Sequence, residues 1–388
     1  MESVVDSHEK TFGWIFEHDA GDAGDASDAI NTSDTGDAGD ADDLPGKKFT
    51  RWLLSGTGMF HIAGKLGSGK STLMKFLYLH PRTQAELQKW AGNRRLVTAN
   101  HFFWKPGSPL QRSLRGLIRS LLYDVLEACP ELIPSTFPNQ WRLLTQSSRL
   151  ARVEASLQTR EIHLGFSRLM QVGHQNMRHC FCFFIDGLDE YDETIPGSYR
   201  DLVKTLCDWV QNPSDSVKIC VSSRENNVFA GISREDQHLR LQDLTRRDIK
   251  LYVHENFKDI CDNDEYRKLR ELIIEKADGV FLWVAVVTKS IRDQLEDGFG
   301  ISTVIQELEA LPIQLEALFY HILMSKQSRS IRRMAFHTLA MVMMGTGSLH
   351  PVPCTLAMYY FMEDYENDPE FATNPLISKP ELIGFTAS

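Results

Sequence analysis

The stretch GKLGSGKS, residues 64–71, has the residue types and the spacing of a phosphate-binding loop. Its glycines let the backbone curl so that successive N–H groups point at one centre, and a helix that begins there adds partial positive charge. In this Walker A pattern the lysine reaches the β- and γ-phosphates of a nucleotide, and the hydroxyl that follows binds Mg²⁺. The pattern predicts a nucleotide-binding set of Gly64, Gly67, Ser68, Gly69, Lys70, Ser71 and Thr72, with Ser71 also a ligand of the metal.

A second stretch, FCFFIDGLDEYD at residues 181–192, runs from apolar residues into a cluster of carboxylates. Acids at the end of a buried strand are costly unless a positive partner lies there, and a divalent cation is such a partner. Because the carboxyl ends of parallel strands meet at one edge of a sheet, we expect Asp186 to lie beside Ser71 and to hold Mg²⁺, directly or through water. Asp189 and Glu190 follow in the next turn, and one of them is expected to orient or activate the water that attacks the γ-phosphate.

The stretch CVSSRE, residues 220–225, places Ser222, Ser223 and Arg224 at the end of another expected strand. A polar residue there can sense the γ-phosphate, and an arginine can neutralise its developing charge. Arg224 is equally compatible with a surface or interdomain salt bridge. Both interpretations stay open, and Arg224 is the third candidate catalytic residue beside Asp189 and Glu190.

Two other patterns favour plain structural explanations. The stretch HQNMRHCFC, residues 174–182, offers His174, His179, Cys180 and Cys182. Its cysteines alternate along an apolar strand and the sequence offers no second ligand pair, which argues against zinc. The basic stripe on the helix expected at 109–128 is more typical of a solvated face than of a nucleic-acid contact; it consists of Arg112, Arg115 and Arg119.

The elements that must position these residues alternate between strand and helix patterns. Strands are expected at 59–64, 96–104, 180–186, 217–223 and 238–244. Helices are expected at 70–80, where Pro81 stops the helix, at 109–128 and at 199–210. This alternation predicts an α/β fold of the P-loop type, in which a parallel sheet is flanked by helices.

From residue 245 the pattern becomes all-helical, and Thr245 with Asp248 makes a plausible cap for a helix over 246–257. Further helices are expected at 264–277, 280–296, 302–310, 313–326, 329–344 and 354–362. The expected organisation is an N-terminal segment 1–18, a disordered Asp/Ala/Gly insertion 19–45, a P-loop domain 46–244, a helical subdomain 245–328 and an incomplete winged-helix-like region 329–388.

Composition and charge narrow the class of protein. The hydrophobic fraction of 42% and the charged fraction of 24% are ordinary for a folded domain. The formal net charge of −10 falls to −1 without the nine Asp of residues 19–43, so bulk charge favours neither nucleic acid nor an anionic membrane as a partner. Seven scattered Cys, an N-terminus without an apolar core and apolar stretches too short to span a bilayer predict a cytoplasmic location.

Several motifs together resemble a known family. FHIAGKLGSGKSTLMKFL, FFIDGLDEYD, ICVSSRE, LQDLTRRDI and GVFLWVAVV, in this order, resemble the NACHT-type P-loop domain of fungal NOD-like (STAND) proteins. The same region is similar to the nephrocystin-type N-terminal P-loop domain. A glycine after Asp186, followed by the Asp189–Glu190 pair, is a feature of that family. The chain departs from the family in its Asp/Ala/Gly insertion, in lacking an effector domain before residue 8, and in showing no ankyrin, WD40 or TPR period after residue 328.

The resemblance implies a switch that binds ATP, or alternatively GTP, with Mg²⁺ and hydrolyses it slowly. It also implies an ADP-bound closed monomer and an ATP-bound open oligomer, hence self-association or association with related NACHT proteins. The nearly neutral charge outside residues 19–43, and not the resemblance, predicts no nucleic-acid partner. Two alternatives remain. One is a non-catalytic, nucleotide-stabilised interaction module or decoy, and the other is an AAA-type remodelling motor that would turn over steadily without a signal.

Overall fold

The structure, a computed structural model, describes residues 11–16, 45–145, 158–176, 178–193, 198–211, 215–259, 263–325, 332–333, 335–336 and 338–340. The chain divides into two compact units, Met1–Lys105 with Pro109–Leu318, and Pro106–Ser108 with Phe319–Ser388. The first unit contains the sheet and its helices. In the second unit, the described residues from 319 onward are helical and begin with the end of α15 (Leu315–Ser325).

In the described residues, five strands form one parallel sheet: β1 (Gly58–Ala63), β2 (Arg95–Phe102), β3 (His179–Asp186), β4 (Val217–Ser223) and β5 (His238–Arg240). Their order across the sheet is β2-β3-β4-β1-β5, and every neighbouring pair is parallel. The expected α/β fold is confirmed. All of these strands end at the same edge of the sheet, and β1 lies between β4 and β5.

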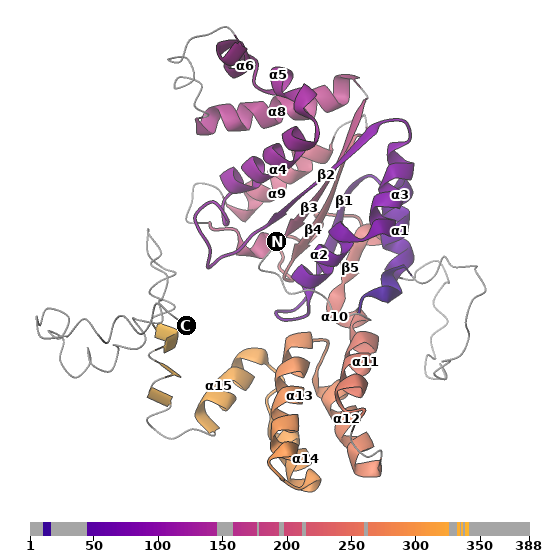
Figure 1. The fold of residues 1–388 in the computed structure, drawn as a ribbon, viewed down its shortest axis with the longest axis vertical. Coiled ribbons are helices and arrows are strands. Elements are labelled where there is room, and N and C mark those ends of the chain that lie inside the picture. The colour runs from indigo at the N-terminus through magenta and orange to yellow at the C-terminus, as the bar shows by residue number, and fades with distance from the viewer. Residues whose placement is uncertain are drawn as a thin grey trace, which may run out of the picture. The chain divides into compact units, whose positions relative to one another are not determined.

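Helices cover both faces of this sheet (Figure 1). One face is covered by α1 (Pro45–Ser55), α2 (Lys70–Leu79) and α3 (Pro81–Ala91), which enclose a core with Phe60 and Ile62 of β1. The other face is covered by α4 (Leu114–Ala128), α8 (Thr159–Asn176) and α9 (Tyr199–Val210).

The interior strand β3, between β2 and β4, contributes side chains to both cores. Cys182 and Phe184 pack on the side of α2, and Phe181 and Phe183 pack on the side of α4. Every residue of β3 is buried. A strand covered on both faces reads as a continuous apolar run, which is why its sequence shows no polar alternation.

Several helix boundaries differ from the expected ones. The helix expected at 109–128 begins at Leu114. The Ser113 hydroxyl accepts a hydrogen bond from Gly116 N at 3.2 Å and so caps the N-terminus of this helix. Pro81 ends α2 but also begins α3, since a proline in the first turn loses no helical hydrogen bond. The sequence pattern predicts no element over 130–178, where the structure has Pro130–Leu132 as a 3₁₀ turn, α5 (Ile133–Thr136), α6 (Pro138–Thr145) and α8.

The helical part begins earlier than expected. Residues 241–244, expected to extend β5, form α10 (Leu241–Leu244) instead, because helical spacing turns Leu241 and Leu244 onto the same core. It continues with α11 (Arg246–Asn256), α12 (Asp264–Lys276), α13 (Phe281–Glu296) and α14 (Ile301–Ala310). These helices bury a core of their own, which includes Ile273 and Trp283.

The expected cap of α11 is wrong. The Thr245 hydroxyl makes no capping bond and donates to the carbonyl oxygen of Gly279 at 3.2 Å. The buried Asp248 carboxylate accepts hydrogen bonds from Phe12 N at 3.2 Å and from Trp14 Nε1 at 2.9 Å. Residues whose local spacing suggests a cap therefore make long-range contacts.

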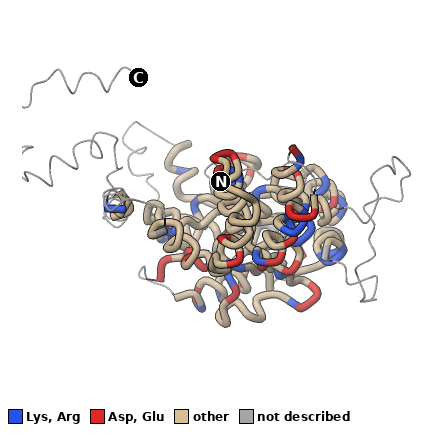
Figure 2. Tube along the Cα trace, turned by 90° about the horizontal axis from the view of Figure 1, so that it is seen from below, with Lys and Arg blue, Asp and Glu red and all other residues tan. Residues whose placement is uncertain are grey.

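Some expectations lie outside the described residues. These are residues 19–44 of the insertion expected at 19–45, the helix at 354–362 and most of the winged-helix-like region 329–388, whereas Pro45 is the first residue of α1. Along the described chain, Lys and Arg alternate with Asp and Glu without a large region of one sign (Figure 2). A helix with the length and apolar character of a membrane span is absent from the described residues.

Candidate nucleotide-binding site

The glycine-rich loop connects the end of β1 to Lys70, the first residue of α2. Gly67 and Gly69 have φ angles of 72° and 93°, in the left-handed region that favours glycine. A Cβ on Gly64 would lie 2.7 Å from the Ser68 hydroxyl, and one on Gly67 would lie 2.9 Å from Leu282 Cβ. The loop therefore needs glycine at these positions, and it is the compact turn that a phosphate cradle requires.

The Lys70 ammonium lies over this loop. Its Nζ donates to the carbonyl oxygens of Gly64 at 2.7 Å and Lys65 at 2.9 Å. Burial lowers the pKa of Lys70, while the negative charges of Asp189 and Asp186 act in the opposite direction. The fold therefore brings the lysine of the first motif close to the carboxylates of the second.

Asp186 is the last residue of β3 and is 3% exposed. The Ser222 hydroxyl donates to its carboxylate and also accepts a hydrogen bond from Gly187 N at 3.0 Å. Burial raises the pKa of Asp186 to about 6, although hydrogen bonds from Ser222 and Ser71 oppose that rise. Ser71 and Asp186 thus lie within side-chain hydrogen-bonding reach across the edge of the sheet, and burial makes this carboxyl harder to ionise than an exposed one.

The turn after β3 places the two candidate catalytic acids in different surroundings. Gly187, with φ 72°, lets the chain enter the 3₁₀ turn Leu188–Glu190. The Asp189 carboxylate accepts from Arg224 N at 2.9 Å and pairs with Arg224 Nε at 3.0 Å. The Glu190 carboxylate accepts from Lys105 N at 3.0 Å. An arginine therefore offsets the charge of Asp189, whereas Glu190 has a neutral backbone donor.

The polar residues at the end of β4 act mainly on other protein groups. Ser222 supports Asp186, and Ser223 Oγ lies 2.9 Å from His61 Nε2. Arg224 forms its salt bridge with Asp189 while its side chain stays about half exposed. The support that Ser222 gives Asp186 is missed by sequence reasoning. The parallel pairing of β3 and β4, with Ile185 opposite Val221, would have revealed it.

The residues present fit a magnesium-bound nucleotide. The Ser71 hydroxyl and the Asp186 carboxylate are the oxygen ligands that Mg²⁺ prefers. The Ser68 hydroxyl, in a side chain that is 1% exposed, has no hydrogen-bond partner among the described residues. A buried hydroxyl without a partner, inside a glycine-rich turn at a helix N-terminus, fits a phosphate oxygen.

The start of α13 lies against the outer side of the loop. Leu282 N donates to the carbonyl oxygen of Gly67 at 2.9 Å. Lys65 Nζ bonds the Asp278 carboxylate at 2.6 Å and the Asp278 carbonyl oxygen at 3.2 Å. Sequence reasoning misses this contact because more than 200 residues separate its two sides and a local pattern carries no signal for it.

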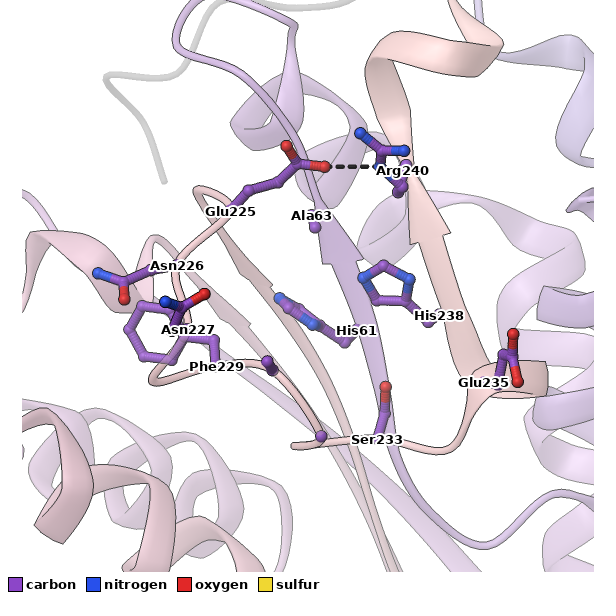
Figure 3. A pocket seen from close by; sticks show the side chains of 12 residues that line it. His61, Ala63, Glu225, Asn226, Asn227, Phe229, Ser233, Glu235, His238 and Arg240 are labelled. Atoms are coloured by element: carbon purple, nitrogen blue, oxygen red, sulfur yellow. Dashed lines mark hydrogen bonds and ion pairs between the residues drawn. The ribbon is translucent and has the colours of Figure 1, made fainter.

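A cavity of about 540 Å³ lies beside the same strand ends (Figure 3). It is lined by His61 of β1 and His238 of β5, whose ring centres are 5.1 Å apart. Burial, with a smaller contribution from the charge of His238, lowers the pKa of His61 to about 3, so this imidazole is neutral. Among the described residues that line the cavity, none belongs to the glycine-rich loop, so the features expected of a phosphate site lie at the loop and not in this cavity.

Comparisons with known proteins agree with this assignment at a coarse level. The family described as Nephrocystin 3, N-terminal, matches residues 44–224, somewhat less than half of the chain, and supports a P-loop NTPase-like domain. No curated protein matches the chain.

Three solved structures illustrate the similarity in fold. The ADP form of the Aeropyrum pernix ORC2 protein is 14% identical and covers 82% of both chains with a TM-score of 0.37. A Walker-type ATPase of Pyrococcus abyssi is 14% identical, covering 82% of this chain and 87% of its own, with a TM-score of 0.36. The Thermotoga maritima RuvB Holliday junction branch migration motor is 14% identical, covering 82% and 80%, with a TM-score of 0.30. At TM-scores below 0.5 these similarities carry no argument about the function of this chain.

Proposed function

We propose that this chain binds ATP, or alternatively GTP, together with Mg²⁺ and hydrolyses it slowly as a NACHT-type conformational switch. The observation that carries the proposal is the contact between Ser71, at the start of α2, and Asp186, at the end of β3. This contact joins the glycine-rich loop to the end of β3, where Asp186 lies, at one edge of the parallel sheet. Ligands of open α/β sheets bind at such an edge.

Each chemical role that Mg–nucleotide binding requires has a residue in this chain that could fill it. The backbone of Gly64, Gly67, Ser68 and Gly69, the first turn at Thr72 and the Lys70 ammonium would hold the phosphates. Ser71 and Asp186 would hold Mg²⁺, whose charge, when it is bound, offsets that of the phosphates. For this to happen the Lys70 ammonium exchanges the carbonyl oxygens of Gly64 and Lys65 for phosphate oxygens.

Glu190 is the better candidate for the residue that orients or activates the attacking water. A general base must accept a proton, and the charge of Asp189 is offset by Arg224. The contact of Glu190 with Lys105 N leaves carboxylate lone pairs for a water molecule. Arg224 would leave Asp189 if it neutralises charge on the γ-phosphate.

The switch would act through the contact between the loop and α13. Lys65 and Gly67 of the loop bond directly to Asp278 and Leu282, so a movement of the loop on nucleotide exchange changes the support of α13. Exposure of new surface by this movement would allow self-association or association with related NACHT proteins. We infer a cytoplasmic location for such a signalling protein.

A second candidate function is a non-catalytic, nucleotide-stabilised interaction module. Its supporting observation is that the charges of Arg224 and Asp189 are satisfied by each other and that Lys70 is bonded within its own loop. An inactive P-loop scaffold would keep these contacts.

The test is nucleotide binding and turnover by the full chain. Fluorescent ATP and GTP analogues are titrated with Mg²⁺ or with a chelator, and phosphate release is followed. We expect Lys70→Ala to weaken binding about 10- to 150-fold, the effect of losing a charge-assisted contact. The exposed lysine variant Lys204→Ala on α9 serves as the matched control.

Turnover variants separate the two candidate functions. Glu190→Gln should bind nucleotide normally and hydrolyse it more slowly than the wild type, while Asp189→Asn should retain hydrolysis. If the roles of these two acids are reversed, the effects exchange. Tight binding with no measurable phosphate release by the wild type supports the non-catalytic module instead.

A further inference from the structure

Three side chains with metal-binding atoms converge at the amino end of the sheet. His179 is the first residue of β3, and Cys129 and Glu131 lie where α4 ends and the 3₁₀ turn Pro130–Leu132 follows. Their ligand atoms all lie within 4.8 Å of one another. His179 and Asp186 occupy opposite ends of the eight-residue strand β3, so this cluster is about 23 Å from the proposed nucleotide site.

The burial of the three side chains differs in a way that suits a bound ion. Cys129 is fully buried and forms the inner wall, while the side chain of Glu131 is about half exposed and faces solvent. His179 is 8% exposed, and its Nδ1 has no hydrogen-bond partner among the described residues. Its Nε2 is 3.5 Å from Glu131 Oε1, at the long limit of a hydrogen bond. This buried imidazole is therefore poorly satisfied by the protein alone.

We propose that Cys129, Glu131 and His179 form a zinc site. A thiolate, an imidazole and a carboxylate are the ligand types that zinc takes, whereas Mg²⁺ and Ca²⁺ prefer oxygen ligands alone. Three protein ligands with a solvent-facing side leave the fourth tetrahedral position to water. The ion would tie the end of α4 to the start of β3.

Arg95 is the neighbouring group that opposes a cation here. Its guanidinium lies 2.8 Å from Glu131 Oε1 and also donates to the carbonyl oxygen of Ala128. A carboxylate has two oxygens, so Arg95 can keep one while the metal takes the other. Because Arg95 offsets part of the charge of Glu131, the Cys129 thiolate would supply much of the negative charge that binds the metal ion. A thiolate ligand favours zinc over harder cations.

The structure also explains why the sequence suggests a different set of ligands. The stretch at 174–182 groups His179 with Cys180 and Cys182, but alternation along β3 turns those cysteines toward the opposite face of the sheet. Cys129 reaches His179 from a separate element. A local spacing rule cannot identify a ligand that packing brings from 50 residues away.

The test is a Co²⁺ titration of the chelator-treated full chain, followed by displacement with Zn²⁺. We expect one Co²⁺ per chain, with a thiolate-to-cobalt charge-transfer band and the intense visible bands of tetrahedral coordination, and displacement by equimolar Zn²⁺. Cys129→Ser should abolish the charge-transfer band. Glu131→Gln and His179→Gln should each lower affinity by at least about tenfold.

Two controls keep the result interpretable. Cys207→Ser changes a partly buried thiol on α9 and should leave the spectrum unchanged. Lys70→Ala should also bind Co²⁺ like the wild type, so a failed nucleotide site and a failed zinc site are distinguishable. Glu131→Gln alters a half-exposed side chain, so it remains informative even if a change at buried Cys129 prevents folding. A wild-type chain without the charge-transfer band, or a Glu131→Gln variant with unchanged affinity, overturns the proposal.

Discussion

Lys70 and Lys218 make the same local arrangement in two regions of the molecule. Each ammonium donates to two main-chain carbonyl oxygens, Lys70 within its loop and Lys218 to Trp52 and Leu53 at the end of α1. Burial lowers the pKa of both, that of Lys218 to about 8. Local hydrogen bonding alone therefore does not distinguish a structural lysine from a functional one.

The surroundings of the two lysines differ. Lys218 is 1% exposed and its ammonium lies 4.4 Å from the ring centre of Trp90 and 5.5 Å from that of Trp52. Lys70 lies beside the carboxylates of Asp186 and Asp189 at the open edge of the sheet. A lysine that is enclosed by aromatic rings and donates to the carbonyl oxygens at a helix end stabilises the fold. A lysine on a glycine-rich loop, beside carboxylates that suit a cation, can exchange its carbonyl partners for phosphate.

The largest expected effect is stabilisation by nucleotide. Ligand that binds the folded state alone, at 1,000 times its dissociation constant, stabilises by about 4 kcal/mol. At roughly 2–4 °C per kcal/mol, this raises the melting temperature by about 8–16 °C. Melts of nucleotide-free protein with and without Mg–ATP or Mg–ADP measure the shift, and Lys70→Ala should lose up to about 3 kcal/mol of it. A wild-type shift near zero at millimolar nucleotide contradicts the proposed switch.

The second effect tests Lys218 as a purely structural residue. Lys218→Met leaves the carbonyl oxygens at the end of α1 without their donor, and we expect a loss of about 1–3 kcal/mol in the free energy of unfolding. Denaturant titration measures this loss, with Lys204→Met on the exposed side of α9 as control. The nucleotide-induced shift in melting temperature should be preserved. Loss of that shift would show that the two lysines are functionally linked.

The third effect is a pH dependence at Asp186. Burial raises the pKa of the Asp186 carboxyl to about 6, above the ordinary value of 3.8, so the carboxyl is harder to ionise in the folded chain than in the unfolded chain. The protonated carboxyl therefore contributes to the free energy of unfolding below pH 4, and this contribution is lost as the pH rises through 6. Mg²⁺ needs the ionised form. Its affinity in the presence of nucleotide should therefore fall about tenfold for each pH unit below 6. Titrations at pH 5, 6 and 7 measure this, and Asp186→Asn should bind Mg²⁺ weakly and without the pH dependence.

The smallest effect concerns the backbone that presents Asp189 and Glu190. Gly187→Ala forces a side chain into a left-handed conformation, at a cost of about 1–2 kcal/mol. Gly231, with φ 81° and no atom within 4 Å of a Cβ, provides a matched control with a similar left-handed conformation outside the turn that holds these acids. Both alanine variants should lose similar stability in denaturant titrations, but Gly187→Ala alone should slow phosphate release. Equal hydrolysis by the two variants contradicts a catalytic role for the turn.

Elements with a strong local pattern are predictable from the sequence. The helix α9 and the strand β4 begin and end at the expected residues, because the apolar spacing of α9 and the β-branched and apolar residues Val217, Ile219 and Val221 of β4 are local signals. The glycine-rich loop between β1 and α2 is predictable for the same reason. Here the special backbone conformations of Gly67 and Gly69 are encoded by the glycines themselves.

Other features depend on contacts between distant residues. The α10 helix forms where a strand is expected because Leu241 and Leu244 must reach one core, and Asp248 bonds Trp14 instead of capping its own helix. The Ser222 hydroxyl supports Asp186 and the guanidinium of Arg224 offsets the charge of Asp189 because β3 and β4 pair in parallel. Residue types and short spacings indicate which chemistry is available. Tertiary packing decides which buried charges are satisfied within the protein and which suit a ligand, since that balance depends on groups that are brought together only when the chain folds.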